Sequence, residues 1–493
     1  MISFLLSVLA LILGYIFYGG FISRVFGPDP ARPTPAISKA DGVDYIPMPT
    51  WKVFMIQFLN IAGTGPIFGA IMGAKFGPAA YLWIVFGCIF AGAVHDYLSG
   101  MISIRHGGAG FPDLVGFYLG KNTKNVMLAF SIVLLLLVGA VFVYSPAIIL
   151  GGIAPVAGSG TGTSMMFWVA VIFIYYILAT MLPIDKIIGK IYPVFAFALI
   201  FMAFSLMVCL IARWPSIPEL WEGLGNRGHS LGVNGQTIFP CLFITIACGA
   251  VSGFHATQSP MMARCIKNEK LGRPVFYGSM IMEGLVALIW AAISSYFFFD
   301  SGAAEVGSSL SAQAPEVVTK VSTGWLGIFG GILAILGVVA APITSGDTAL
   351  RSARLITADF LKIDQKKVRN RLLTCLPIFI LVAILLKINM SDSQGFNKVW
   401  GWFGWANQTL SVFMLWTATV YLAKTKKGQF YYFLALIPAS FMTSVAVTYF
   451  FVSKTGILPA GWTFTVGLAT FLLSLIAFDL WRIHRLKITI NNQ

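Results

Sequence analysis

Long apolar stretches alternate with short polar segments along the whole chain. Each stretch is about 20 residues long, which is the length that an α-helix needs to cross the hydrocarbon core of a bilayer. The stretches fall at residues 2–22, 51–73, 78–102, 125–150, 164–182, 190–212, 236–254, 274–299, 324–346, 372–388, 397–423, 429–453 and 461–481. The pattern therefore predicts an all-α polytopic membrane protein with about 13 transmembrane helices.

Two of these stretches are interrupted near their middle by residues that disfavour a continuous helix. The first, residues 51–74, is broken at residues 60–66, and the second, residues 237–260, is broken at residues 249–260. A helix interrupted inside a bilayer leaves backbone N–H and C=O groups unpaired unless protein, water or a ligand satisfies them. Paired interruptions at corresponding positions of two halves indicate the binding site of a secondary transporter.

The two interrupted stretches lie five spans apart, so each of them begins a set of five. Because five is an odd number, the second set must cross the membrane in the opposite sense to the first. This is the inverted repeat of the APC/LeuT-like transporters. The predicted domains are an N-terminal helix with a Pro-rich loop, a first repeat, a second repeat and C-terminal extra helices, at residues 1–50, 51–235, 236–425 and 426–493.

The composition supports a membrane protein and argues against a nucleic-acid-binding protein, which is the usual interpretation of a strongly basic chain. The chain of 493 residues is 58% hydrophobic and 10% charged, whereas soluble domains carry about 25% charged residues. Its net charge of +15 would suit nucleic acid, but most of the 33 lysines and arginines fall in alternate loops. This positive-inside pattern predicts an N-terminus outside, a cytoplasmic C-terminus and no nucleic-acid partner.

Several further features carry structural predictions. Residues 107–121 are Gly-rich and form either a re-entrant segment or a short interfacial helix. Residues 347–371 are basic and amphipathic, so the preceding span is expected to continue as a helix into the cytoplasm. The six cysteines show no CxxC or Cys/His ligand spacing and are interpreted as free packing residues. Small residues recur every four positions after the first interruption, which is typical of close helix packing, at Gly65, Gly69, Gly73 and Gly77.

Ionisable side chains inside the spans are the first candidates for chemistry. His95 and Asp96 lie in one span and Glu283 in another, and ionisable residues inside a membrane usually serve a function. Neighbouring positions on a helix point about 100° apart, so His95 and Asp96 are not expected to form a relay with each other. These three residues and Asp347 are predicted to couple or gate transport. The alternative is a structural polar clamp or ion pair between helices.

Polar residues and glycines near the interruptions are the candidates for binding a substrate. The free N–H groups at the N-terminus of a half-helix attract a carboxylate. The side chains are equally suited to satisfying the backbone groups that the interruptions leave unpaired. The predicted substrate-binding residues are Asn60, Gly63, Thr64, Gly65, His255, Gln258 and Asn407.

A third group of residues suits a sodium ion. Ala341, Thr344 and Ser345 share one helical face beside Pro342. Two hydroxyls with nearby backbone carbonyls would provide the hard oxygen ligands that such a cation prefers. The alternative is an ordinary Ser/Thr contact between helices. No cofactor is predicted apart from Na⁺ or H⁺ as the coupling ion.

The sequence also separates broad classes of function. It contains no HExxH, no GxSxG and no Walker loop, so the protein is predicted not to be an enzyme. A channel is compatible with the composition. Interrupted helices together with acidic residues near the membrane midplane favour a transporter over a channel.

Segments spread over about residues 29–410 resemble the carbon starvation protein A (CstA) family. They read DPARPTPA, DGVDYIP, FLNIAGTGPIFGAIMGA, AGAVHDYLSGMISIRHGG, PIDKIIGKIYP, VSGFHATQSPMMARCIKNE, MIMEGLVALIWAA, PITSGDTALRSARL and FGWANQTL. The length matches the short form of the family, without the longer C-terminal extension. The resemblance implies an APC/LeuT-like uptake transporter of the bacterial inner membrane that is expressed under nutrient limitation.

The resemblance also implies substrates and coupling ions. Members of the family are described as peptide transporters, and some longer members resemble pyruvate–proton symporters. Those longer members carry a His pair where this chain has Ile56 and Gln57, so a proton path through that pair is not expected. The three residues of the candidate sodium site match an Ala-x-x-Thr-Ser pattern of similar sodium transporters, which implies partners among the carbonyls of residues 61–64.

The predicted function is therefore the secondary active import of short peptides or amino acids by alternating access. Pyruvate or a related monocarboxylate is the alternative substrate. A membrane sensor of starvation is the alternative from another class, and the lack of a recognisable signalling domain counts against it. The predicted partners are a small-molecule substrate and the lipid membrane, and the sequence leaves the oligomeric state open.

Overall fold

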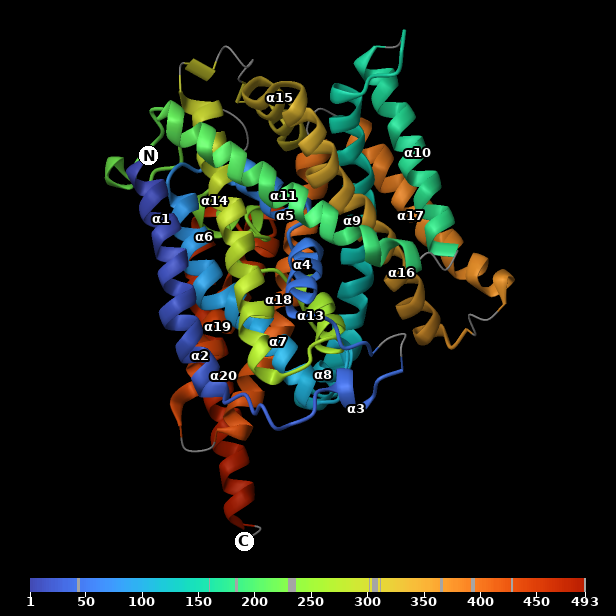
Figure 1. Cartoon of the computed structure of the whole chain (residues 1–493). Coiled ribbons are helices and arrows are strands. Elements are labelled where there is room, and N and C mark those ends of the chain that lie inside the picture. Colours follow the sequence, from blue (N-terminus) through green and yellow to red (C-terminus); the bar gives the residue numbers. More distant parts are fainter. Residues whose placement is uncertain are drawn as a thin grey trace.

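The computed structural model describes residues 1–41, 45–158, 160–181, 185–228, 236–300, 302–303, 309–310, 312–363, 367–391, 395–426 and 429–491. Within these residues every regular element is a helix (Figure 1). The α-helices are α1 (Ile2–Leu13), α2 (Gly19–Phe26), α3 (Pro35–Ser38), α4 (Thr50–Ile61), α5 (Thr64–Ala74), α6 (Ala79–Phe86), α7 (Ala93–Arg105), α8 (Phe111–Leu119), α9 (Lys121–Ile153), α10 (Thr161–Met181), α11 (Asp185–Arg213), α12 (Phe243–Thr245), α13 (His255–Ala263), α14 (Gly278–Phe299), α15 (Ala314–Leu333), α16 (Ala340–Leu361), α17 (Val368–Ser391), α18 (Gly395–Thr425), α19 (Phe433–Thr448) and α20 (Thr463–Asn491).

The helices agree with the predicted pattern of spans. Within the described residues, 10 helical stretches are long and apolar enough to cross a membrane, and 11 if the bent pair α4–α5 counts as one span. The two other predicted spans correspond to α18 and to the segment that contains α12 and α13. The helices α12 and α13 are too short to cross a membrane alone, and α18 carries the buried polar residues Asn407 and Gln408. The all-α membrane fold is thus confirmed, whereas the count of 13 and the domain boundaries stay predictions.

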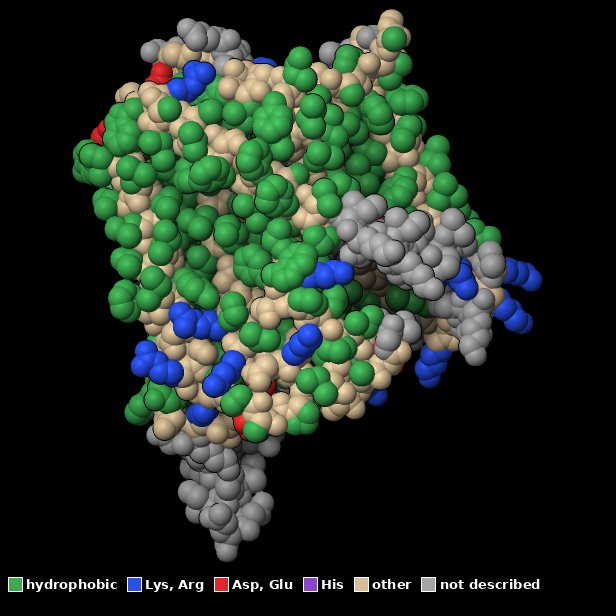
Figure 2. All heavy atoms as spheres, viewed as in Figure 1, with side chains coloured by type: hydrophobic (Ala, Val, Ile, Leu, Met, Phe, Trp, Pro, Cys, Tyr) green, Lys and Arg blue, Asp and Glu red, His purple; other side chains and the backbone are tan. Residues whose placement is uncertain are grey.

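The outer surface has the distribution of side chains that a bilayer requires. On the face shown in Figure 2, apolar side chains form a broad band, and lysines and arginines gather below it. In the same view the start of α1 lies level with the upper part of the band, and α20 extends below it (Figure 1). The two ends of the described chain therefore lie toward opposite ends of the molecule in this view.

The first predicted interruption is present between α4 and α5. The two helices meet at a bend of 48° after a break at Ala62 and Gly63. Three of the four glycines predicted to pack helices do so on α5, namely Gly65, Gly69 and Gly73, whereas Gly77 lies beyond α5 with φ of +82°. A Cβ atom on Gly65 would overlap the thiol of Cys248, and a Cβ atom on Gly69 would lie 3.0 Å from the carbonyl oxygen of Thr245. The α5 helix therefore packs directly on the second interrupted segment.

The second interruption begins earlier than predicted and is shorter. The chain leaves the helical conformation after α12 and resumes it at His255, so the irregular segment covers residues 246–254 and not 249–260. Gly249 lies inside it with φ of +89°, a conformation that favours glycine. Pro260 lies inside α13 and does not end it, because its fixed φ is compatible with a helix and only one hydrogen bond is lost.

The structure also answers the two predictions about loops. Residues 107–121 contain the short helix α8, which packs against α9 and α18. The span that contains Pro342 continues without interruption to Leu361 as α16, as the amphipathic pattern predicts. These elements surround a centre in which both interruptions, α7, α14 and α18 meet.

Candidate functional site

The two interruptions lie against each other in the middle of the bundle. Gly65 at the start of α5 packs on Cys248, and the Cβ position of Gly249 lies 3.5 Å from the Cβ of Pro66. The backbone N–H of Gly249 donates a hydrogen bond of 3.1 Å to Glu283 Oε1 on α14. The predicted convergence of the two interruptions is therefore present, and a buried carboxylate satisfies one of the freed N–H groups.

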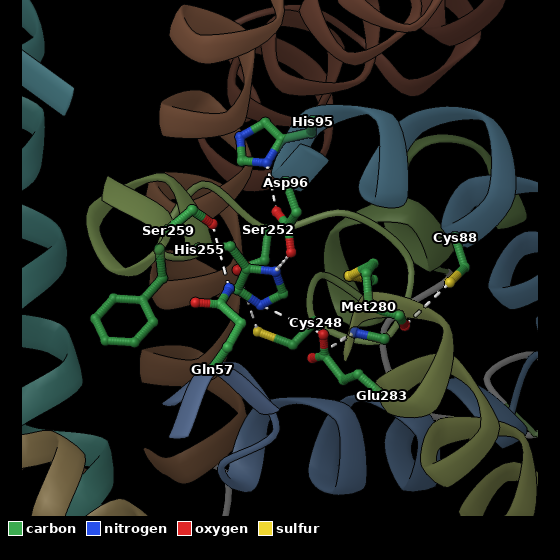
Figure 3. A network of polar contacts seen from close by, with 12 residues as sticks. Gln57, Cys88, His95, Asp96, Cys248, Ser252, His255, Ser259, Met280 and Glu283 are labelled. Atoms are coloured by element: carbon green, nitrogen blue, oxygen red, sulfur yellow. Dashed lines mark hydrogen bonds and ion pairs between the residues drawn. The ribbon is translucent and has the colours of Figure 1, made fainter. Parts of the chain in front are cut away.

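Four buried ionisable side chains form a continuous chain beside this junction (Figure 3). Asp96 holds one histidine with each carboxylate oxygen: Oδ1 lies 2.8 Å from His95 Nδ1 and Oδ2 lies 2.9 Å from His255 Nδ1. On the other side of the second imidazole, His255 Nε2 lies 3.5 Å from Glu283 Oε2. All four side chains are fully buried. Acid and imidazole alternate along the chain, which is the arrangement that transfers or holds a proton.

One prediction about these residues is wrong. His95 and Asp96 were not expected to contact each other because adjacent helical positions point in different directions, yet their side chains are hydrogen-bonded. The angle of about 100° separates the Cα–Cβ directions. The imidazole and the carboxylate extend beyond Cβ and turn toward each other.

Asn407 on α18 holds the second interruption in place. Its Oδ1 accepts hydrogen bonds from the N–H of Phe254, at 2.8 Å, and from the hydroxyl of Ser252, at 3.1 Å. Its backbone carbonyl accepts a third from the N–H of Gly253, at 3.2 Å. Asn407 therefore accepts hydrogen bonds from backbone N–H groups that the interruption leaves unpaired, which is the alternative to binding a substrate. Its contact with a substrate stays a prediction.

Unfilled space and an unpartnered hydroxyl occur together at the first interruption. A Cβ atom on Gly63 would meet no atom within 4 Å, although the residue is buried. The hydroxyl of the neighbouring Thr64 is buried and has no hydrogen-bond partner among the described residues. Asn60 is half-buried on the last turn of α4. Gln258 is buried on α13, where its Nε2 donates to the hydroxyl of Thr257.

The residues of the predicted sodium site lie on α16, which packs mainly against α9. The hydroxyl of Thr344 donates to two carbonyls of its own helix, those of Ala340 at 3.1 Å and Ala341 at 2.9 Å. Ser345 is buried beside it. The site stays a prediction.

Asp347, a predicted coupling residue, is also on α16. Its carboxylate accepts hydrogen bonds from Tyr175 of α10, at 2.8 Å, and from Thr348, at 2.9 Å. The structure places it at the contact between α10 and α16. Its coupling role stays a prediction.

Three residues of the junction were not predicted as functional. Cys248 and Ser252 lie in the irregular segment, and Gln57 on α4 donates to Ser259 of α13 at 3.2 Å. The cysteine shows no ligand spacing in the sequence, because the side chains around it come from α13 and α14. A signal was nevertheless available, since Cys248 directly precedes the glycine of the interruption.

Sequence comparison places the chain among known proteins. The profile of the carbon starvation protein CstA family matches residues 1–158, 143–327 and 307–449. The chain belongs to this family. The peptide transporter CstA of Escherichia coli is 26% identical over 562 residues, which cover 90% of this chain and 79% of that protein. An uncharacterized membrane protein of Haemophilus influenzae is 47% identical over 339 residues, covering 60% of this chain and 91% of that protein.

Another protein that is similar to this chain is named for the transport of pyruvate and not of peptides. The pyruvate/proton symporter BtsT of Escherichia coli is 26% identical over 371 residues, which cover 62% of this chain and 51% of that protein. The names of these relatives agree with a membrane transporter and not with an enzyme.

Solved structures confirm the LeuT-like fold. The manganese transporter of Eremococcus coleocola superposes with a TM-score of 0.59 at 12% identity, covering 90% of this chain and 98% of that one. A Na⁺-coupled sialic acid symporter superposes with a TM-score of 0.50 at 11% identity, covering 96% of this chain and 95% of that one. At such identities the likeness shows the fold alone. It is the fold of secondary transporters with inverted repeats.

Proposed function

We propose that this CstA protein is a proton-coupled importer of short peptides or amino acids in the bacterial inner membrane. It works by alternating access, with its N-terminus outside and its C-terminus in the cytoplasm. The observation that carries the proposal is the buried chain from His95 through Asp96 and His255 to Glu283, which lies against the junction of the two interruptions.

The cost of burying charge supports the proposed coupling to protons. An unpaired charge in an apolar interior is expensive, so the number of protons on the four side chains determines which of their contacts are favourable. Glu283 Oε1 accepts from the N–H of Gly249, and His255 is the first residue of α13. A proton that arrives between His255 Nε2 and Glu283 Oε2 therefore changes contacts on both sides of the second interruption.

The substrate is proposed to bind with its carboxylate at the start of α5. The first N–H groups of a helix have no partner within the helix, and the helix dipole favours an anion there. The unfilled space at Gly63 and the unpartnered hydroxyl of Thr64 lie at this helix end. Asn60, Gly65 and Gln258 are the proposed neighbours of the bound molecule.

Peptides and amino acids share the required carboxylate, and the relatives named peptide transporter CstA support this substrate class. Pyruvate or a related monocarboxylate is the second candidate, because it carries the same group and a relative is named a pyruvate/proton symporter. Coupling to Na⁺ through Ala341, Thr344 and Ser345 is the alternative to coupling through protons.

Uptake into proteoliposomes tests the proposal. The purified full chain is reconstituted, and the accumulation of labelled dialanine, alanine and pyruvate is measured under an inward H⁺ gradient or an inward Na⁺ gradient. We expect accumulation under the H⁺ gradient. No accumulation of any of the three under either gradient would contradict import of these substrate classes, and accumulation that requires Na⁺ alone would contradict proton coupling.

A further inference from the structure

Three potential metal ligands of different chemistry meet at the junction of the interruptions. They are the thiol of Cys248, the imidazole of His255 and the carboxylate of Glu283. One ligand atom from each lies within 4.8 Å of the other two, and all three residues are buried. In Figure 3 the three side chains point toward one another from the irregular segment, from α13 and from α14.

We propose that Cys248, His255 and Glu283 bind a divalent transition-metal ion of the zinc type, with one coordination position left open. A second observation points to a bound ion: two of the side-chain atoms that would bind the metal make no hydrogen bonds to described residues. His255 Nε2 and Glu283 Oε2 are both buried, and neither has a hydrogen-bond partner in the described part of the chain. Buried polar atoms are normally hydrogen-bonded, whereas these two only face each other at 3.5 Å, and a metal ion between them would bind both.

Each proposed ligand is also held by a hydrogen bond of the kind that orients ligands in metal sites. His255 turns Nδ1 to Asp96 Oδ2, at 2.9 Å, which leaves Nε2 available. Glu283 is fixed through Oε1 by the N–H of Gly249, at 3.1 Å. A carboxylate behind a ligating histidine is a recurrent feature of metal sites, because it sets the tautomer and the orientation of the ring.

The chemistry of the three proposed ligands favours some metal ions over others. Thiolate and imidazole suit Zn²⁺ and Co²⁺, whereas Na⁺, Mg²⁺ and Ca²⁺ prefer oxygen ligands alone. Bond lengths of 2.0–2.3 Å place tetrahedral ligand atoms about 3.5 Å apart. His255 Nε2 and Glu283 Oε2 already have this separation, at 3.5 Å. The thiol of Cys248 completes the set, and three protein ligands leave a fourth position for water or a ligand.

The metal ion would occupy the gap in which the proposed function places a proton. Metal binding requires a thiolate and an unprotonated imidazole, so metal and protons compete. We therefore expect Zn²⁺ to inhibit uptake, and this expectation rests on the proposed function. The binding of the metal itself does not.

Binding is measured on the purified full chain in detergent with Zn²⁺ or Co²⁺ as the only addition. We expect one ion per chain, and for Co²⁺ the charge-transfer absorption of a thiolate ligand. Cys248→Ser is expected to weaken binding by more than about 100-fold, and Asp96→Asn by about 10- to 100-fold, the usual effect of losing an orienting partner. The matched control is Cys375→Ser, which alters a buried cysteine on α17 and should leave binding unchanged.

Two results would overturn the metal site. One is the absence of stoichiometric binding by the unmodified chain. The other is equal binding by Cys248→Ser and Cys375→Ser. If Cys248→Ser does not fold, a variant that retains Cys248 and replaces the five other cysteines by serine must keep the cobalt–thiolate absorption, and its loss there also overturns the site.

The uptake measurement distinguishes this inference from the proposed function. Metal binding without uptake of any substrate would contradict the proposed function and leave the metal site standing. Proton-driven uptake by a chain that binds neither Zn²⁺ nor Co²⁺ would contradict the metal site and leave the proposed function standing.

Discussion

Glu269 and Glu283 are both fully buried glutamates, but their surroundings differ. Glu269 Oε2 accepts from the N–H of Asp29, at 2.7 Å, and from Arg105, at 3.3 Å, and its Oε1 lies 3.5 Å from Arg32. Glu283 receives one hydrogen bond, from a backbone N–H, and its Oε2 has none among the described residues.

The difference indicates which of the two acids is the better candidate for a role in transport. The contacts of Glu269 pin the segment after α2 to the end of α7, where Arg105 also donates to the carbonyl of Gly27, at 2.7 Å. The carboxylate of Glu269 thus faces two arginines and a backbone N–H, which favour its charged form. Glu283 keeps one oxygen available beside His255. A buried acid that retains binding capacity is therefore the better candidate for function than one that is fully paired.

The largest expected effect is on transport by Glu283→Gln. The amide keeps the size of the side chain and an acceptor for the N–H of Gly249, but it cannot take up a proton. Because groups that transfer protons contribute about 10²- to 10⁴-fold to a rate, we expect proton-driven uptake to fall by at least about 100-fold. The melting temperature in detergent should stay close to that of the unmodified chain. Retained uptake would show that Glu283 resembles Glu269 in being structural.

The next effect is on stability, from Glu269→Ala. Removing one partner of a buried ion pair leaves the other charges uncompensated. Arg32 and Arg105 keep some exposure, with 46% and 20% of their side chains accessible, so we expect a loss at the low end of the usual range, about 3 kcal/mol. Thermal unfolding in detergent measures it. Uptake per folded molecule should be unchanged, and a selective loss of uptake would remove the contrast with Glu283.

A smaller effect is expected from alanine at the two glycines of the first interruption. Gly65→Ala forces a methyl group onto the thiol of Cys248, and overpacking of this kind costs about 1–3 kcal/mol. Gly63→Ala is the matched control, because its methyl group meets no atom within 4 Å. Gly63→Ala should leave the melting temperature unchanged. It should raise the KM for substrate uptake, because the added methyl group narrows the unfilled space. Equal destabilisation by both would mean that the space at Gly63 is filled in the protein.

The smallest effect is expected from replacing both Thr344 and Ser345 by alanine. The hydroxyl of Thr344 already donates within its own helix. If protons couple transport, the ion dependence of uptake should be unchanged in the double variant. A loss of Na⁺-dependent uptake would instead assign coupling to α16, away from the histidines and acids of the interior.

The sequence predicts the parts of this site and misses how they connect. The apolar pattern, with Gly63, Gly65 and Gly249, predicts both interruptions, because a cluster of glycines with a proline inside a span disfavours a continuous helix. His95, Asp96, His255 and Glu283 are identified one by one, since charge inside a membrane is costly. Their connection into one chain depends on the packing of α7, α13 and α14, which no local pattern contains.

The errors have the same origin. The contact of His95 with Asp96 depends on side-chain rotation beyond Cβ. Cys248 is interpreted as a packing residue because its neighbours in space are distant in sequence. The predicted end of the second interruption is wrong because α13 begins before Pro260 and continues past it.

Proton movement during uptake tests the central claim most directly. Proteoliposomes that contain a pH-sensitive dye are given a gradient of labelled substrate, and substrate entry and lumenal pH are recorded together, for the unmodified chain and for Glu283→Gln. We predict that substrate entry acidifies the lumen in the unmodified chain and that both signals are lost in Glu283→Gln. Substrate entry without acidification, or acidification that persists in Glu283→Gln, would contradict the claim that this buried chain of acids and imidazoles couples transport to protons.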